Sequence, residues 1–278
     1  MRDNSQIYSL VALDIDGTMI GGDRIVKPEL IKAIARVQTA GAVVSVSTGR
    51  TLTPALRIAQ ESGAKGPVIC FQGAMTFDQL KNMEVRHERL DEIVAAQAIS
   101  GLTSIVPEVM MFLGNDVWVE KRSEWTDGYG QRMGVSIRDT DSLMTMVDHK
   151  PTAIVGVGAP EIVGPLVEKL HALLNGLALV THSLPMFCEI EAIGAGKDLA
   201  VEHLAGLLNV DRNGVIAVGD GKGDQSMIEW AGLGIAVDGG HPDAVCAADR
   251  VIDSPENFGL VNFLNELCGA GKFGPPVI

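Results

Sequence analysis

The chain has 278 residues, of which 46% are hydrophobic and 21% are charged, so it is long enough to build two domains with substantial cores. Its formal net charge of -13 disfavours nucleic acid as a partner, because binding to a phosphate backbone depends on Lys and Arg, and an anionic substrate would need a local cation. We expect no membrane span and no secretory signal, since no window approaches about 18 uninterrupted apolar residues and the N-terminus lacks a basic region followed by a long apolar stretch.

The first part of the chain alternates patterns typical of strands and helices. The apolar run 8–15 predicts a strand that ends at a pair of aspartates, and 27–41 predicts a helix with Pro28 near its start and Gly41 at its end. A strand and turn at 42–50, a short helix at 53–63 and a third strand at 66–74 follow. This alternation favours right-handed crossovers and a parallel sheet.

The middle of the chain has a different pattern. Two apolar runs around residues 114–116 predict a hairpin, and a strand at 152–160, a helix at 161–174 and strands at 177–182 and 186–192 come next. We therefore expect an α+β unit, spanning 84–188, inserted between the two halves of an α/β core, 1–83 and 189–278.

The last part returns to the first pattern, with helices predicted at 197–210, 224–232 and 259–269 and strands at 213–221 and 233–240. The cysteines are scattered and form no C-x-x-C pair, which predicts buried structural thiols and a cytoplasmic protein; they are Cys70, Cys188, Cys246 and Cys268.

Four polar features fall at the carboxyl ends of predicted core strands, where ligands bind in open α/β sheets. They are residues 14–18 (DIDGT), 47–50 (STGR), Lys197, and 219–224 (GDGKGD). Each has an ordinary structural explanation when it is considered alone, such as a turn or a helix start. A calcium loop is excluded because Gly17 and Ile25 stand at the wrong positions, and a phosphate loop is excluded because Asp198 follows Lys197.

Taken together, the order and spacing of these features resemble the haloacid dehalogenase superfamily of phosphohydrolases, and more narrowly its Cof-type branch. The resemblance covers nearly the whole chain. It implies a Rossmann-like core with a parallel sheet flanked by helices, and it implies that the inserted α+β unit is a cap domain that reads the substrate.

The resemblance also implies a role for each position. Asp14 would be the nucleophile that forms an aspartyl phosphate, and Asp16 would be the general acid and base. Mg²⁺ would be held by Asp14, by the backbone carbonyl of Asp16, by Asp220 and, directly or as support, by Asp224. The phosphoryl group would be held by Thr48, Lys197 and the amides near Ile15 and Gly49.

Charge repulsion leads independently to a cation. Two unit charges about 4 Å apart interact by roughly 4 kcal/mol at an effective dielectric near 20, so carboxylates alone would repel a phosphate dianion. A divalent cation reverses the sign, and oxygen ligands suit Mg²⁺. Asp16 further favours phosphate chemistry over dehalogenation, because an alkoxide leaving group needs a proton donor and a halide does not.

Three positions depart from the family pattern. The family usually has Asn where this chain has Gly223, and relatives often have Asn where it has Gln72. Residues 237–240 (VDGG) replace the usual Met-Gly-Asn-Ala. We therefore expect activity with rearranged phosphate contacts near Gly223; Lys222 is either a compensating cation or a solvated surface lysine.

The sequence thus predicts a magnesium-dependent phosphatase acting on a small phosphorylated metabolite such as a sugar phosphate. The alternatives are a phosphomutase or other phosphotransferase of the same superfamily, and a catalytically degenerate protein that binds a phosphorylated metabolite. We expect no nucleic acid or membrane partner. The oligomeric state, monomer or homodimer, is left open.

Overall fold

The computed structural model describes residues 6–276, which form two compact units. The core unit consists of the described residues before Thr51, Ala55–Val85, and those after Ala195; the inserted unit consists of Thr51–Pro54 and Arg86–Ala195. The predicted boundaries of the functional domains, at 84 and 188, stay a prediction.

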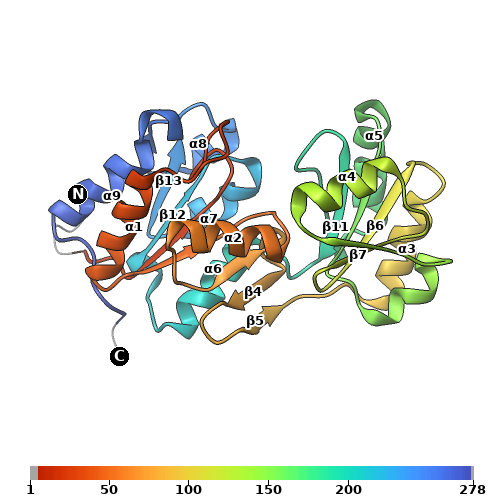
Figure 1. Ribbon diagram of the computed structural model, residues 1–278, viewed down its shortest axis with the longest axis horizontal. Coiled ribbons are helices and arrows are strands. Elements are labelled where there is room, and N and C mark those ends of the chain that lie inside the picture. The colour runs from red at the N-terminus through yellow and green to blue at the C-terminus, as the bar shows by residue number, and fades with distance from the viewer. Residues whose placement is uncertain (1–5, 277–278) are drawn as a thin grey trace. The chain divides into compact units, whose positions relative to one another are not determined.

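The core unit is built on a five-stranded parallel sheet with the strand order β14-β13-β12-β1-β2 (Figure 1). Its strands are β1 (Leu10–Leu13), β2 (Val43–Val46), β12 (Val215–Gly219), β13 (Leu233–Val237) and β14 (Arg250–Ile252). Every residue of β1, β12 and β13 is buried, which requires that both faces of the sheet are covered.

Six helices lie wholly or mostly in the described part of the core unit. They are α1 (Pro28–Thr39), α2 (Leu52–Ser62), α6 (Lys197–Leu207), α7 (Gln225–Trp230), α8 (Pro242–Ala247) and α9 (Gly259–Gly269). A buried cluster joins α6 and α7 to alternate residues of β1 and β12, while α1 and α9 pack against each other. Every core helix and strand predicted from the sequence is present, although most are shorter by one to a few residues.

A second, three-stranded sheet follows the first half of the core. It consists of β3 (Val68–Cys70), β4 (Met75–Asp78) and β5 (Met83–His87), and β3 and β4 are antiparallel. The sequence analysis predicted only β3 of these. A short 3-10 turn, Phe71–Gly73, joins β3 to β4.

The inserted unit has its own six-stranded sheet with the order β10-β11-β9-β6-β7-β8. Its elements are β6 (Glu108–Leu113), β7 (Asp116–Val119), β8 (Ser136–Asp139), β9 (Ala153–Val157), β10 (Ala178–Thr181), β11 (Phe187–Ala192), α3 (Glu92–Leu102), α4 (Glu124–Met133) and α5 (Pro160–Leu173). The predicted hairpin is confirmed, because β6 and β7 pair antiparallel. The predicted α/β class with a separate α+β insertion is likewise confirmed.

Each face of the inserted sheet is covered differently. Helices α3 and α5 pack on one face through a large apolar cluster that includes Met111, Ile154 and Ile190. Helix α4 contacts the other face, where Tyr129 makes an edge-to-face contact with Phe112. The unit therefore contains a hydrophobic core of its own.

The prediction that the cysteines are buried is confirmed for two of them, only partly met by a third and wrong for the fourth. Cys70 and Cys188 are buried and Cys268 is partly buried, but Cys246 is exposed. Cys246 lies on α8, a six-residue helix that buries only Ala244, so a short helix at the surface leaves most of its side chains in solvent.

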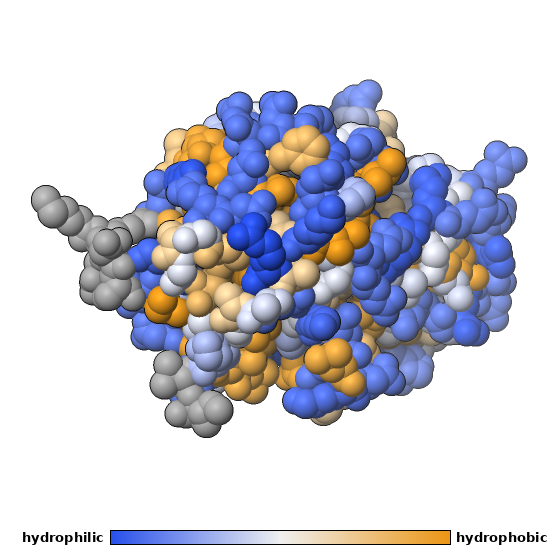
Figure 2. All heavy atoms as spheres, turned by 60° about the vertical axis from the view of Figure 1, so that its left-hand side comes forward, coloured by the Kyte–Doolittle hydropathy of each residue, from blue (hydrophilic) through white to orange (hydrophobic). Residues whose placement is uncertain are grey.

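The surface carries both hydrophobic and hydrophilic residues, as expected for a chain that is 46% hydrophobic and 21% charged (Figure 2). In the face shown in Figure 2, hydrophobic and hydrophilic residues alternate in small areas. Within residues 6–276, no helix combines the length and apolar character needed to cross a membrane.

One charged group of the inserted unit is buried without compensation. Glu191 on β11 is 4% exposed, and its Oε2 atom has no hydrogen-bond partner among the described residues. It lies on the same face of β11 as Glu189, which accepts hydrogen bonds from Ser183. Burial, with a contribution from Glu189, raises the pKa of Glu191 well above its ordinary value.

We predict that Glu191 makes folding less favourable as the pH rises. Because its pKa in the folded chain is above that in the unfolded chain, the unfolded state loses the proton first, and stability falls as the pH climbs above the ordinary value of a glutamate. The Glu191→Gln variant should therefore lose less stability between pH 5 and pH 8 than the wild type, as measured by urea unfolding. The control is Glu168→Gln on the exposed face of α5. Equal pH dependence of the wild type and Glu191→Gln would contradict the prediction.

Candidate active site

Two aspartates follow β1, at the carboxyl end of the parallel sheet. Asp14 is 6% exposed, and its backbone N–H continues the ladder to Val218 of β12. Asp16 is exposed, because the chain turns sharply after Ile15, whose carbonyl accepts from three successive N–H groups in residues 18–20. The turn thus sends one carboxylate inward and the other outward.

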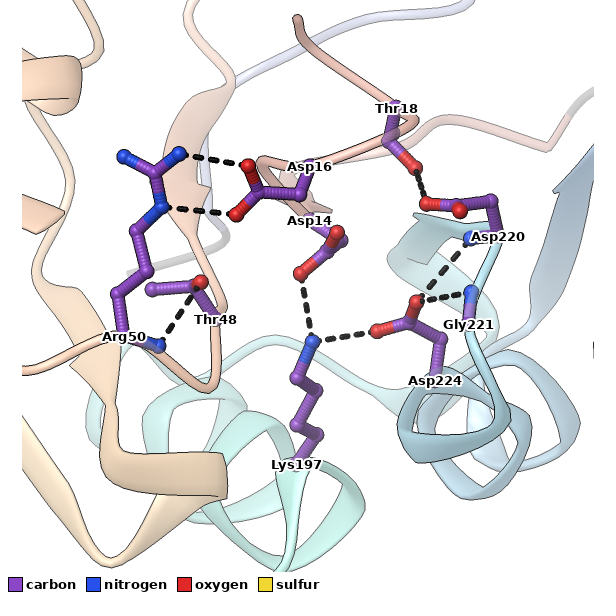
Figure 3. A network of polar contacts seen from close by, with 9 residues as sticks. All are labelled: Asp14, Asp16, Thr18, Thr48, Arg50, Lys197, Asp220, Gly221 and Asp224. Carbon is purple, nitrogen blue, oxygen red and sulfur yellow. Dashed lines mark hydrogen bonds and ion pairs between the residues drawn. The ribbon is translucent and has the colours of Figure 1, made fainter. Parts of the chain in front are cut away.

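Lys197 lies at the centre of the buried carboxylates. Its Nζ atom donates to Asp14 Oδ1 at 2.6 Å and to Asp224 Oδ1 at 2.5 Å, and its side chain is 4% exposed (Figure 3). Burial by itself lowers the pKa of Lys197, but the two carboxylates outweigh burial and raise it, so the amine stays charged. A buried cation is therefore fixed between a strand end of the sheet and the turn after β12.

For the pKa of Asp14, burial and a neighbouring negative charge outweigh the effect of the lysine. Burial and the charge of Asp224 raise the pKa of the Asp14 carboxyl, and Lys197 opposes the rise. Burial also raises the pKa of Asp220 to about 6, with Asp224 adding to it and a hydrogen bond from Thr18 opposing it. The carboxylates are thus crowded beyond what a single lysine neutralises.

Asp220 follows β12 and approaches the backbone of the DIDGT turn closely. Thr18 Oγ1 donates to Asp220 Oδ1 at 2.9 Å. A Cβ atom at Gly17 would lie 2.2 Å from Asp220 Oδ2, and the φ of Gly17 is +79°, a conformation that favours glycine. Gly17 is therefore required twice, for its backbone conformation and for the space that Asp220 occupies.

Asp224 organises the turn on which Asp220 lies. Its Oδ2 atom accepts from the backbone N–H groups of Asp220 and Gly221, at 3.1 and 2.8 Å, while Oδ1 accepts from Lys197. Both of its oxygens are thus engaged by the protein. By contrast, Asp14 Oδ2 and Asp220 Oδ2 accept no hydrogen bond from the described residues.

The turn after β2 supplies hydroxyl and amide groups. Thr48 is 2% exposed, and its Oγ1 atom accepts from the N–H of Arg50 at 3.2 Å. The N–H groups of Ile15 and Gly49 donate to no group in residues 6–276. They are therefore available to a bound anion.

Asp16 has a partner that the sequence did not predict. Arg50 Nε and Nη2 donate to the two carboxylate oxygens of Asp16 at 2.7 and 2.6 Å, a bidentate ion pair (Figure 3). The Asp16 side chain is 58% exposed, so the pair is open to solvent and the carboxylate is free to exchange partners.

The carboxylates fit a divalent cation. One oxygen from each of Asp14, Asp220 and Asp224 lies within 4.8 Å of the others. Carboxylate oxygens suit Mg²⁺, and the two oxygens without partners belong to Asp14 and Asp220. The donor set therefore matches an acidic metal site with two free carboxylate ligands, and Asp224 acts as the support that positions Asp220 and Lys197.

The structure brings all the predicted site residues into the core unit, at the carboxyl edge of its sheet. They are Asp14, Ile15, Asp16, Thr48, Gly49, Lys197, Asp220 and Asp224. Sequence reasoning gave no role to Thr18 or Arg50, although both belong to the quoted motifs. Thr18 contacts Asp220 and Arg50 contacts Asp16, each on a different loop, so no local sequence pattern predicts these contacts. Lys222 is exposed, as expected for a solvated lysine.

The chain is similar in sequence to known proteins over most of its length. Residues 11–264 match the family described as haloacid dehalogenase-like hydrolase. The phosphoglycolate phosphatase of Methanopyrus kandleri is 26% identical, over 93% of this chain and 97% of its own length. The 5-amino-6-(5-phospho-D-ribitylamino)uracil phosphatase YcsE of Bacillus subtilis is also 26% identical, over 88% of this chain and 90% of its own length.

The fold is likewise similar to that of solved structures. The structure of the HAD subclass IIB sugar phosphatase BT4131 superposes with a TM-score of 0.81 and 17% sequence identity, covering 94% of this chain and 99% of that one. This likeness shows the fold, a parallel core sheet with a separate inserted sheet that forms a cap.

We predict that Lys197→Ala destabilises the chain and makes its stability depend more strongly on metal. Removing one partner of a buried ion pair costs about 3–5 kcal/mol, since uncompensated charge remains buried. Added Mg²⁺ should then raise the free energy of unfolding more in the variant than in the wild type, because it replaces the missing cation. Urea unfolding with and without chelator measures this, with Lys222→Ala as the control. An equal response to Mg²⁺ in the wild type and in Lys197→Ala would refute it.

Proposed function

Because the chain belongs to the haloacid dehalogenase-like hydrolase family, and to the phosphatases within it, we propose that it hydrolyses a phosphomonoester of a small metabolite, such as a sugar phosphate, through an aspartyl phosphate. One observation carries the proposal. Asp14 has one oxygen held by Lys197 and one without a partner, beside an aspartate cluster that fits a divalent cation. The names of the two relatives support the substrate class, since each describes a phosphatase of a small phosphorylated compound.

Binding comes first in the proposed mechanism. Asp14, Asp220 and the backbone carbonyl of Asp16 would hold Mg²⁺, with Asp224 as support. The ion would neutralise charge on the phosphoryl oxygens and on the carboxylates. Lys197, Thr48 and the amides of Ile15 and Gly49 would hold the phosphoryl oxygens, so that positioning and charge stabilisation supply most of the catalysis.

Chemistry then proceeds in two displacements. An Asp14 oxygen attacks phosphorus while the ester P–O bond breaks, and the leaving oxygen takes a proton from Asp16. In the second displacement Asp16 accepts a proton from water, the water oxygen attacks phosphorus, and the bond to Asp14 breaks to release inorganic phosphate. Asp16 must leave Arg50 to reach the leaving oxygen, and its exposed position permits this rotation.

We predict that Asp14→Asn abolishes turnover, because an amide is a far poorer nucleophile than a carboxylate. Asp16→Asn should lower kcat by about 10²–10⁴-fold, the usual contribution of general acid–base catalysis. Release of inorganic phosphate from a panel of phosphorylated metabolites measures both, and Asp23→Asn, in the exposed segment after the turn, is the control. Substantial turnover by Asp14→Asn would disprove the assignment of the nucleophile.

The same assay separates the alternatives. A phosphatase releases inorganic phosphate in the absence of an acceptor, whereas a phosphotransferase needs a second hydroxyl compound to turn over. A degenerate binding protein would bind a phosphorylated metabolite and release no phosphate from it. Either of the last two results would overturn the proposed reaction.

We further predict that a chelator silences the enzyme and that Mg²⁺ restores it. Ca²⁺ should restore little activity, because it is larger and prefers more ligands than the two free carboxylate oxygens and a carbonyl supply. Steady-state phosphate release after metal removal and replacement measures the effect. Full activity in the presence of chelator would rule out a metal-dependent mechanism.

A further inference from the structure

The side chain of Gln72 occupies space that two glycines of the site leave open. A Cβ atom at Gly49 would lie 2.4 Å from Gln72 Nε2, and a Cβ atom at Gly223 would lie 3.1 Å from Gln72 Oε1. Neither glycine has a φ in the left-handed region, so the backbone does not require glycine there. What both positions share is the carboxamide of Gln72 beside them.

These glycines place the carboxamide at the candidate site. Gly49 is the residue after Thr48 and has a free N–H group, and Gly223 is the residue before Asp224. The carboxamide of Gln72 therefore lies between the turn that follows β2 and the turn that follows β12. All of these residues belong to the core unit.

The backbone of Gln72 is held in a costly conformation. Phe71 and Gln72 have φ values of 50° and 49°, and a non-glycine residue in the left-handed region costs on the order of 1–3 kcal/mol. Their N–H groups donate to the carbonyls of Arg50 and Thr48, at 2.9 and 3.2 Å, which fixes the turn against the STGR segment. Asn adopts this conformation more readily than Gln, so the local backbone does not explain why Gln stands here.

The carboxamide itself has no partner. It is half-buried, and neither its oxygen nor its nitrogen forms a hydrogen bond with a residue of the described chain. Within the described residues the amide has donors without an acceptor, and it lies beside Gly49, whose backbone N–H also donates to no group there, so it is suited to an anionic oxygen.

We propose that Gln72 is a substrate-binding residue whose NH₂ group, between Gly49 and Gly223, donates a hydrogen bond to an oxygen of the substrate's phosphate. This inference rests on the proposed function. The extra methylene of Gln relative to Asn provides the reach, and the absence of a side chain at position 223 provides the room. Gln72 and Gly223 thus form a matched pair.

The test uses four variants of the whole chain and two readouts. Gln72→Asn shortens the side chain and suits the left-handed backbone, so it should fold at least as stably as the wild type. Its KM for a phosphomonoester and its inhibition constant for inorganic phosphate should each rise about tenfold, as expected for loss of a hydrogen bond to a charged group, with a smaller change in kcat. Gln72→Glu keeps the shape but brings a negative charge, and it should raise both constants further.

The third and fourth variants test the pairing. Gly223→Asn alone should weaken phosphate binding, since even its Cβ atom would lie only 3.1 Å from Gln72 Oε1 and would crowd the carboxamide. The double variant, Gln72→Asn with Gly223→Asn, should recover much of the lost affinity, because the shorter residue 72 leaves room for an amide at position 223. Such non-additivity shows direct coupling between the two positions.

The outcomes separate this inference from the proposed function. An active wild type with unchanged constants in Gln72→Asn, or strictly additive effects in the double variant, overturns the role of Gln72 alone. A wild type that neither releases phosphate from any phosphomonoester nor binds inorganic phosphate in the presence of Mg²⁺ overturns both.

Discussion

The structure of the site depends on one constraint, which is the repulsion among carboxylates gathered at the carboxyl edge of a parallel sheet. Asp14 and Asp224 are both nearly buried, and the ammonium group of Lys197 lies within hydrogen-bond distance of each. One positive charge does not balance Asp14, Asp220 and Asp224 together, and the three carboxylates lie close enough to hold a divalent cation. In a chain of formal net charge -13, an anionic substrate would need local cations of this kind.

Division of labour among the aspartates follows from how their oxygens are engaged. Both oxygens of Asp224 accept hydrogen bonds, one from Lys197 and the other from the backbone of its own turn, and the latter fixes Asp220 in place. Asp14 and Asp220 each keep one oxygen that accepts no hydrogen bond from residues 6–276. Asp16 lies outside this group, paired with Arg50 and exposed to solvent, as the proton-carrying role proposed for it requires.

The backbone packs closely around the aspartates and Gln72 because glycines stand at three positions, for two different reasons. Gly17 combines a left-handed conformation with contact to Asp220, whereas Gly49 and Gly223 leave space for the side chain of Gln72. The departure from the family pattern at Gly223 is therefore not an isolated loss. It is accompanied by a longer amide at position 72, so a polar group still stands between the two turns.

The sequence by itself determined most of the core elements, the presence of an insertion, and which aspartates and which lysine are the candidates for the site, because these motifs are local and lie beside buried strands or helix starts. It missed the short or weakly patterned elements β4, β5, α3, α4, β8, α8 and β14, and the exposure of Cys246. Only the tertiary structure decided that Arg50 pairs with Asp16, that both oxygens of Asp224 accept hydrogen bonds, and that Gln72 lies beside Gly223. Such contacts join loops that are distant in the chain, and their geometry is fixed by sheet packing rather than by any local pattern.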